Sequence, residues 1–405
     1  MMVPISKIVQ ARRRLNSVIS HTPLVLSPHL CEATGCEVYL KSENLQITGA
    51  YKIRGAYNKI SSLSAEEKQK GVITASAGNH AQGVAHSAKK FGVPAIIVMP
   101  FATPLLKVLG TKQLGAEVLL RGDNFDEAFA FATEYAQQEG LTFIHPFDDE
   151  MVMAGQGTIA LEMLDAPNQF DYVVVPVGGG GLISGVASAI KQLDPRIRVI
   201  GATAKGAPAM YNSFQAGKVI NSTSVRTIAD GIAVRDVSPN VLSCVTECVD
   251  DIVQVDDEEI ANAILFLLEK QKIVVEGGGA AGVAAILHHR FPYKPGERIA
   301  TILSGGNIDV QALSIIIEKG LIKAARRMTI SVTLIDKPGA LMELTTVLQS
   351  ANANIIKIDY DRFSVKLAYG DAKITITLET KGEEHKQEIR DLLAAAHYEF
   401  SEIFE

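Results

Sequence analysis

The pattern of apolar and polar positions divides the chain into a long region of continuous apolar runs and a tail of alternating ones. Between about residues 70 and 320, short apolar runs alternate with stretches of helical periodicity. Continuous runs are typical of parallel strands covered on both faces, and their alternation with helices predicts an α/β fold. One set of runs precedes residue 145 and another follows residue 170, which predicts two lobes with parallel sheets. The expected strands are 71–75, 95–100, 117–120, 172–177, 199–202 and 299–303, and the expected helices are 82–91, 124–139, 185–193 and 258–271.

The tail of the chain has a different pattern. Residues 373–378 alternate between apolar and polar, which is typical of a half-exposed antiparallel strand. The predicted order β-α-β-β-α-β is that of a ferredoxin-like module. Its strands are expected at 328–335, 355–358, 373–378 and 397–404, and its helices at 340–351 and 383–396. We therefore expect a first domain over 1–320 (small lobe about 48–145, large lobe the remainder), a charged linker over 321–327 and a second domain over 328–405.

The composition excludes several classes of protein. Hydrophobic residues make up 47% of the 405 residues and charged residues 21%, which rules out a largely disordered chain, a collagen-like repeat and a disulfide scaffold. The formal net charge of −6 provides no basic field, so we expect no nucleic-acid partner. No run reaches the ~18 uncharged apolar residues of a membrane span. We expect a cytoplasmic protein with no membrane partner.

The cysteines and the basic N-terminus each allow two interpretations. The cysteine spacings, C-x4-C and C-x3-C, lack the tight pairs of a structural zinc site, so we expect reduced thiols and no metal. Residues 5–14 are basic and precede the first acidic residue, Glu32, as in a transit peptide. We favour a helix packed on the body, because four apolar residues share one of its faces (Ile5, Ile8, Val9 and Leu15).

Four consecutive glycines, Gly178–Gly181, follow the apolar run 172–177 and precede an apolar helix. Such a turn exposes backbone N–H groups at a helix N-terminus and favours an anion. Ser184 stands where a dinucleotide fingerprint needs its third glycine, and no Gly-Lys-Ser/Thr of a P-loop follows. The pattern therefore favours a single phosphate. A tight turn without a ligand is the alternative.

Two further polar loops, 76–80 and 304–307, also follow apolar runs. Ligands of open α/β sheets bind beyond the carboxyl ends of the strands, so we expect the three loops to meet at one site. Lys52 lies among small and apolar residues within 48–56. A desolvated lysine loses its proton easily and can form a Schiff base, although a surface lysine is the alternative. One such lysine together with one phosphate loop indicates pyridoxal phosphate as the cofactor.

These motifs resemble a known family. Residues 48–56, 74–83 (TASAGNHAQG), 177–182 and 303–309 (LSGGNID) resemble the four signatures of the threonine dehydratase (threonine ammonia-lyase) branch of fold-type II pyridoxal-phosphate enzymes. The similarity extends over about residues 5–320. Residues 328–405 resemble an ACT regulatory domain, with the segment 336–341 (DKPGAL) at its ligand loop.

The resemblance implies a role for each matching position. Lys52 would hold the cofactor and take the α-proton, and Tyr51, which departs from the usual Phe, would pack against the ring. Asn79 would bind the ring hydroxyl and Ser304 would face the pyridine nitrogen. The phosphate would be held by Gly178, Gly179, Gly180, Gly181 and Leu182, the substrate carboxylate by Ser76, Ala77, Gly78, Asn79 and His80, and an amino-acid effector by Gly339, Ala340 and Leu341.

The implied reaction is α,β-elimination of L-threonine to 2-oxobutanoate and ammonia, with L-serine to pyruvate as a side activity. Control through the ACT region implies a homo-oligomer, a dimer or a tetramer, in isoleucine biosynthesis or threonine catabolism. A serine racemase or serine dehydratase is the main alternative, but Ala77 occupies the position of the racemase's second base, and 203–210 has no carboxylate for its metal. A second alternative is a non-catalytic protein that senses an amino acid. Glu276 could line the site or serve as a structural carboxylate at a helix start.

Overall fold

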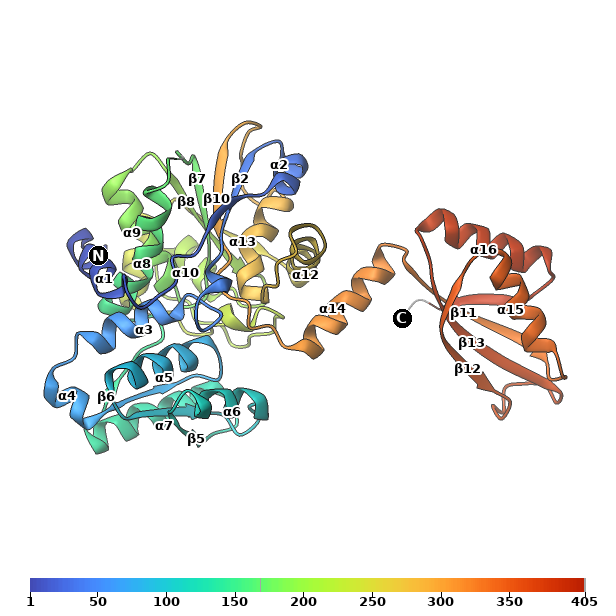
Figure 1. Cartoon of the computed structure of the whole chain (residues 1–405), viewed down its shortest axis with the longest axis horizontal. Helices are drawn as coiled ribbons and strands as arrows, with labels where there is room; N and C mark the ends of the chain where they lie inside the picture. Colours follow the sequence, from blue (N-terminus) through green and yellow to red (C-terminus); the bar gives the residue numbers. More distant parts are fainter. Residues whose placement is uncertain (168, 404–405) are drawn as a thin grey trace. The chain divides into compact units, whose positions relative to one another are not determined.

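The computed structural model describes residues 1–167 and 169–403, which form two compact units, Met1–Asp309 and Val310–Glu405 (Figure 1). The first unit contains two sheets. Its larger sheet has the order β1-β2-β10-β7-β8-β9, and only the β1–β2 pair is antiparallel. These strands are β1 (Leu24–Leu26), β2 (Glu37–Lys41), β7 (Tyr172–Pro176), β8 (Arg198–Ala204), β9 (Asp251–Val255) and β10 (Arg298–Ile302).

The smaller sheet of the first unit is wholly parallel, with the order β5-β4-β3-β6. Its strands are β3 (Val72–Ala75), β4 (Ala95–Met99), β5 (Glu117–Leu120) and β6 (Thr142–Phe143). All four residues of β3 and all five of β7 are buried, as continuous apolar runs predict. The predicted α/β class with parallel sheets is therefore confirmed.

The helices of the first unit begin and end at recognisable signals. Asn124, Asp149 and Asp256 each accept hydrogen bonds from backbone N–H groups of the helices that they precede. The helices are α1 (Ile5–Leu15), α2 (Pro28–Thr34), α3 (Lys52–Ser61), α4 (Ala65–Lys70), α5 (Asn79–Phe91), α6 (Leu105–Gln113), α7 (Phe125–Glu139), α8 (Glu150–Leu164), α9 (Gly181–Leu193), α10 (Ala209–Ala216), α11 (Pro239–Cys248), α12 (Asp257–Phe266) and α13 (Gly277–Leu287). Short helical turns lie at η1 (Glu43–Leu45), η2 (Asp230–Ile232) and η3 (Leu267–Gln271).

Two differences from the expected helices concern the loops that were predicted to bind ligands. Helix α5 begins at Asn79 rather than at residue 82, and α9 begins at Gly181 rather than at residue 185. The last residues of each loop are therefore helical, whereas 76–78 and 178–180 precede the helices. The N-terminal helix is present as predicted, with Ile8 and Leu15 buried, but Val9 is exposed.

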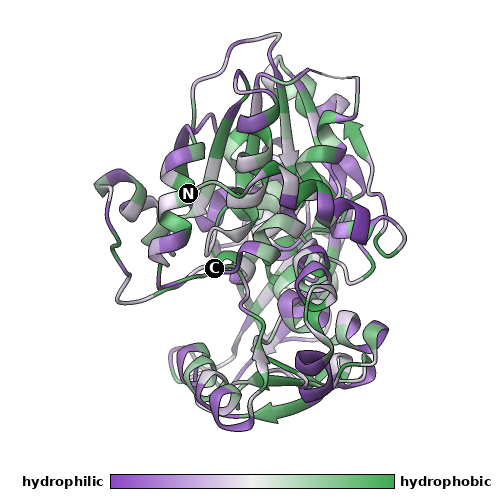
Figure 2. Cartoon of the chain, turned by 90° about the vertical axis from the view of Figure 1, so that its left-hand side faces the viewer, coloured by the Kyte–Doolittle hydropathy of each residue, from purple (hydrophilic) through white to green (hydrophobic). Residues whose placement is uncertain are grey.

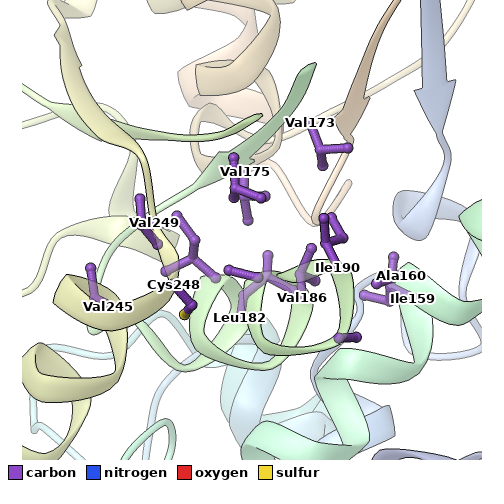
Figure 3. Close-up of a cluster of buried hydrophobic side chains, with 14 of the residues drawn as sticks. Ile159, Ala160, Val173, Val175, Leu182, Val186, Ile190, Val245, Cys248 and Val249 are labelled. Atoms are coloured by element: carbon purple, nitrogen blue, oxygen red, sulfur yellow. The ribbon is translucent and has the colours of Figure 1, made fainter. Parts of the chain in front are cut away.

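The core of the larger lobe lies between strand β7 and helix α9. Val173 and Val175 of the strand approach Leu182, Val186 and Ile190 of the helix (Figure 3). Helices α8 and α9 lie so close together that a Cβ atom on Gly185 would be 2.1 Å from the carbonyl oxygen of Met153. Hydrophobic residues follow the strands and hydrophilic residues the outward faces of the flanking helices (Figure 2). In the part of the chain that is described, no helix combines the length and apolar character needed to cross a membrane.

The second unit has an antiparallel sheet with the order β12-β13-β11-β14. Its elements are α14 (Val310–Lys323), β11 (Arg327–Ile335), α15 (Ala340–Ser350), β12 (Asn354–Asp361), β13 (Asp371–Glu379), α16 (Glu383–Ala395) and β14 (Phe400–Ile403). From β11 onward this is the predicted β-α-β-β-α-β order of a ferredoxin-like module. Helix α14 includes the first three residues of the segment 321–327. Residue 404, the end of the strand expected at 397–404, lies outside the described residues.

Candidate active site

The segment before helix α3 is held against the loop that follows β10. The backbone N–H of Tyr51 donates to the carbonyl of Ser304 at 3.1 Å, and Ala50 forms a β-bridge with Gly305. Gly49 has a φ of +72°, and a Cβ there would lie 2.4 Å from Oδ1 of Asn307, so this position requires glycine. Tyr51 precedes the first turn of α3, which places Lys52 at the first helical position.

The amine of Lys52 lies deep among protein atoms, although the residue as a whole keeps partial exposure. Its Nζ donates to the carbonyl oxygen of Pro146 at 2.7 Å and lies 5.4 Å from the centroid of the Tyr51 ring. Within the described residues, no carboxylate forms a salt bridge with it. Burial lowers the pKa of Lys52 to about 8, and the Glu276 carboxylate opposes this shift in part.

Asn79, the first residue of α5, connects three loops. Its Nδ2 donates to Oε1 of Glu276 at 2.7 Å, and its Oδ1 accepts from Nδ2 of Asn307 at 2.8 Å. Asn307 Nδ2 is also 2.9 Å from the carbonyl oxygen of Thr48. The start of α5, the start of α13 and the loops around residues 48 and 307 thus meet through side-chain amides.

The glycine quartet is packed so closely that side chains would collide with its neighbours. A Cβ on Gly178 would lie 2.8 Å from Cα of Ile232, one on Gly179 would lie 2.3 Å from the Phe147 ring, and one on Gly181 would lie 2.8 Å from Cα of Phe147. Gly180 has a φ of +85° and precedes α9. The first N–H groups of a helix have no acceptor within it, so the start of α9 offers several donors to an anion.

The loop 76–80 lies at the carboxyl end of β3, as predicted. Ser76, Ala77, Gly78 and Asn79 are half-buried. His80 is buried, with Nε2 3.0 Å from the Ile144 carbonyl oxygen, and burial lowers its pKa to about 3. The neutral imidazole therefore donates to Ile144, which leaves the backbone N–H as the group by which His80 could contact a carboxylate.

Three residues that shape this geometry were not predicted from the sequence. Pro146 supplies the carbonyl for Lys52, Phe147 covers the glycines, and Asn307 orients Asn79. Asn307 lies inside the motif LSGGNID, which was a usable signal. The short segment after β6 gave none. Glu276, whose role the sequence left open, is 5% exposed and bonded to Asn79.

A second group of buried charges, which we call the ionic cluster, lies two residues further along α3. It consists of Lys41, Glu43, Arg54 and Glu162. Arg54 bonds Glu43 through Nε (2.8 Å) and NH2 (2.7 Å), and Glu162 through NH1 (2.6 Å). Burial opposes its charge, but the two carboxylates raise the pKa of Arg54 above its ordinary value. This cluster joins β2, η1, α3 and α8.

The cysteines form no disulfide in the described structure. All four cysteines are free, and the Sγ atoms of Cys244 and Cys248 lie 4.0 Å apart in the interior. Over residues 1–167 and 169–403, no group of three or more His, Cys, Asp or Glu side chains could hold a metal ion.

The geometry fits pyridoxal phosphate. Lys52 offers a desolvated amine to an aldehyde, the start of α9 offers donors to a phosphate, and Asn79 offers an amide to a ring hydroxyl.

Comparisons with known proteins agree with this geometry. Residues 15–305 match the family model described as pyridoxal-phosphate dependent enzyme. The chain is 48% identical to an L-threonine ammonia-lyase of Thermotoga maritima (98% of this chain, 99% of that protein). It is 44% identical to a catabolic L-threonine dehydratase of Escherichia coli strain K12 (77% of this chain, 95% of that protein).

Solved structures lead to the same family. The processed form of threonine deaminase isoform 2 from Solanum lycopersicum is 39% identical, with a TM-score of 0.75, over 78% of this chain and 87% of that one. Maize serine racemase is 36% identical, with a TM-score of 0.74, over 80% of this chain and 99% of that one. This chain therefore belongs to the family of pyridoxal-phosphate-dependent enzymes, in the branch that contains the L-threonine ammonia-lyases.

Proposed function

We propose that this chain eliminates water from L-threonine to release an enamine, whose tautomer takes up water and hydrolyses to 2-oxobutanoate and ammonia. It would convert L-serine to pyruvate in the same way, more slowly. The observation that carries the proposal is the Lys52 amine, which is desolvated, free of salt bridges in the described structure and within electrostatic range of Glu276, the partner of Asn79. The threonine ammonia-lyase relatives that cover almost all of the chain support this substrate class.

Five parts of the chain would hold the cofactor. Lys52 would bind its aldehyde, Asn79 its ring hydroxyl, Ser304 its pyridine nitrogen and the N–H groups of 178–182 its phosphate, while Tyr51 would pack on the ring. When bound, pyridoxal phosphate withdraws electrons from the α-carbon of an amino acid and makes the α-proton acidic. A hydroxyl such as that of Ser304 supports weaker electron withdrawal than a carboxylate would, which favours rapid loss of the β-hydroxyl.

Lys52 is suited to carry a proton in the reaction. A pKa of about 8 lies near physiological pH, so the amine can release and take up a proton with little cost. In the cofactor-free chain, the Pro146 carbonyl lies 2.7 Å from Nζ and orients the amine that would meet the cofactor. Holding the base in place makes the transfer of the α-proton effectively unimolecular.

The substrate carboxylate would bind at the start of α5. This helix has 13 residues, and the loop 76–80 that opens it presents backbone N–H groups at its positive end. Racemisation would need a second proton carrier on the opposite face of the substrate. Ala77, at the position that the racemase resemblance assigns to this base, has only a methyl group. We therefore favour elimination over racemisation.

The second unit would regulate the first, as an ACT domain binding an amino acid in a homo-oligomer. Gly339, with a φ of +92°, precedes α15, and Gly339, Ala340 and Leu341 would contact the effector. The match with the Escherichia coli dehydratase covers 95% of that enzyme but 77% of this chain. A relative thus exists without the length of the second unit, which supports a role outside the chemistry.

A substrate panel tests the proposal. Release of 2-oxo acid is measured for L-threonine, L-serine and other amino acids, with wild type and Lys52→Ala, and with or without isoleucine or valine. We expect threonine to be the best substrate, Lys52→Ala to be inactive and an amino acid to change the rate. Equal release by Lys52→Ala would refute the mechanism, and indifference to every amino acid would refute the regulatory role.

A further inference from the structure

Glu276 occupies the position before helix α13 but does not cap it. Its side chain makes no hydrogen bond to the first turn of that helix. Instead, Oε1 accepts from Asn79 Nδ2 at 2.7 Å, while the backbone N–H of Glu276 donates to the Gly305 carbonyl at 3.0 Å. An ordinary N-cap carboxylate would accept from the N–H groups of its own helix. The side chain is therefore directed to α5, more than 190 residues away in sequence.

Two glycines make the room that this carboxyl group occupies. A Cβ on Gly305 would lie 2.4 Å from Oε1, and a Cβ on Gly231 would lie 3.0 Å from the same atom. Gly305 follows β10, and Gly231 lies in η2. The backbone of two separate segments therefore lies close to the Glu276 carboxyl group, with no side chain between them. The carboxyl group is packed against the backbone of both segments.

The charges that face Glu276 come from several elements. Asp230 (η2) acts to raise the pKa of Glu276, and Lys107 (α6) acts to lower it. The Glu276 charge in turn acts to raise the pKa of Lys52 (α3) and that of Tyr51. In the described residues it has no salt-bridge partner. Burial, more than Asp230, raises the pKa of Glu276 to about 7, while the hydrogen bonds from Asn79 and the Asn307 backbone act in the opposite direction.

The geometry points to Glu276 as a positioning residue that acts through Asn79 on the cofactor ring. Glu276 fixes the nitrogen end of the Asn79 amide and Asn307 fixes the oxygen end, so the amide cannot rotate. The second N–H of Asn79 is then the one that would meet the ring hydroxyl. This inference rests on the proposed function, in which Asn79 binds that hydroxyl.

The carboxyl also sets the charge beside Lys52. When Glu276 is ionised, it favours the charged form of the Lys52 amine, and when it takes up a proton, this support is lost. A change in the charge of this carboxyl, which is bonded to Asn79, should alter the absorbance of the bound cofactor, so we expect a spectral transition near pH 7 that depends on Glu276. A merely structural carboxylate would not produce such a transition.

The test uses the holoenzyme of three variants. Glu276→Gln keeps the size of the side chain and removes its charge, and Glu276→Asp keeps the charge and shortens the reach. Glu259→Gln is the matched control, because Glu259 is also buried at a helix start but bonds within its own capping box and to Arg290. Two quantities are followed from pH 5.5 to 9: the absorbance of the bound cofactor, and kcat and KM for threonine.

We expect Glu276→Gln to lower kcat roughly 10- to 100-fold with little change in KM. The carboxylate accepts from both Asn79 and the Asn307 backbone, whereas glutamine replaces one acceptor oxygen by a donor group, so the Asn79 amide loses its fixed position. A misplaced ring costs rate more than substrate binding. The spectral transition near pH 7 should disappear in Glu276→Gln, return in Glu276→Asp and persist in Glu259→Gln. An unchanged transition and kcat in Glu276→Gln would overturn the inference. If Glu276→Gln does not fold, a transition in Glu276→Asp with the wild-type midpoint and wild-type kcat would overturn it equally.

The experiment distinguishes the lyase activity from the positioning role of Glu276. If the wild-type holoenzyme releases no 2-oxo acid from threonine, the proposed function fails, but the spectral titration still reports on Glu276. If the enzyme is active and the titration is independent of residue 276, the proposed function stands and the positioning role fails.

Discussion

Two cations on helix α3, Lys52 and Arg54, lie two residues apart in very different surroundings. The Arg54 guanidinium is fully buried in the ionic cluster and bonds two carboxylates, Glu43 and Glu162. The Lys52 amine is also desolvated, but its only hydrogen-bond acceptor in the described structure is the Pro146 carbonyl. As a result, the pKa of Arg54 is raised and that of Lys52 is lowered to about 8.

The difference shows that burial alone does not decide what a buried cation does. Burial disfavours the charge in both cases, and the presence of carboxylate partners reverses the outcome for Arg54. Arg54, whose charge is balanced by two carboxylates, links helix α3 to η1 and α8. Lys52 has no carboxylate partner in the described structure and can exchange a proton near neutral pH, as a residue that acts as nucleophile and base must.

The largest effect is expected from placing the wrong cation at each position. Lys52→Arg keeps a positive charge but cannot lose its proton, so we predict a loss of activity of at least about 1,000-fold. The 2-oxo acid assay measures this, and bound cofactor is quantified by absorbance. Arg54→Lys, the reverse exchange, should reduce stability and leave the cofactor bound. Substantial activity in Lys52→Arg would contradict the assigned role.

A large loss of stability is predicted for breaking the ionic cluster. Arg54→Met leaves Glu43 and Glu162 buried without their main partner, which should lower the free energy of unfolding by about 3–5 kcal/mol. Denaturant unfolding measures this. The control is Arg298→Met, which breaks the half-exposed pair with Glu37 and should cost less than about 1 kcal/mol. Equal losses in the two variants would show that the cluster is not compensated as described.

A smaller and pH-dependent effect is predicted for removing the uncompensated amine. In the cofactor-free protein, the pKa of Lys52 falls from 10.5 to about 8 on folding, which corresponds to a destabilisation of about 3 kcal/mol below pH 8. The unfolded chain binds more protons between pH 8 and 10.5, so wild-type stability should rise with pH in this window. Lys52→Met should be the more stable protein at pH 7, and its advantage should shrink by pH 10. A constant difference would indicate that the amine is not desolvated.

Much of the catalytic fold followed from local sequence patterns. Buried parallel strands are continuous apolar runs, and those runs were found at β3, β4, β5, β7, β8 and β10. The two-residue strand β6 is too short to leave a pattern, and β1, β2 and β9 were not anticipated. Glycine and asparagine have low helix propensity, so the first turns of α9 and α5 were expected as loops. These residues occur at helix starts, where the backbone N–H groups have no hydrogen-bond acceptor within the helix.

The candidate site was predicted to a different depth at each residue. Lys52 and Gly178–Gly181 carry a local signal, because their chemistry depends on neighbours in the sequence. The partners that tune them do not: Pro146 is 94 residues from Lys52, and Glu276 is 197 residues from Asn79. The ionic cluster was missed for the same reason, since Arg54 and Glu162 are 108 residues apart. Pairings of this kind are set by the fold and leave no periodicity.

The central claim is that Lys52 is the residue that carries the cofactor, and chemical trapping tests it most directly. Purified holoenzyme is reduced with borohydride and digested, and the peptides are mapped by mass spectrometry. We predict a pyridoxyl group on Lys52 and on no other lysine, with none incorporated in Lys52→Arg. An unmodified Lys52, or a pyridoxyl group on a different lysine, would contradict the claim.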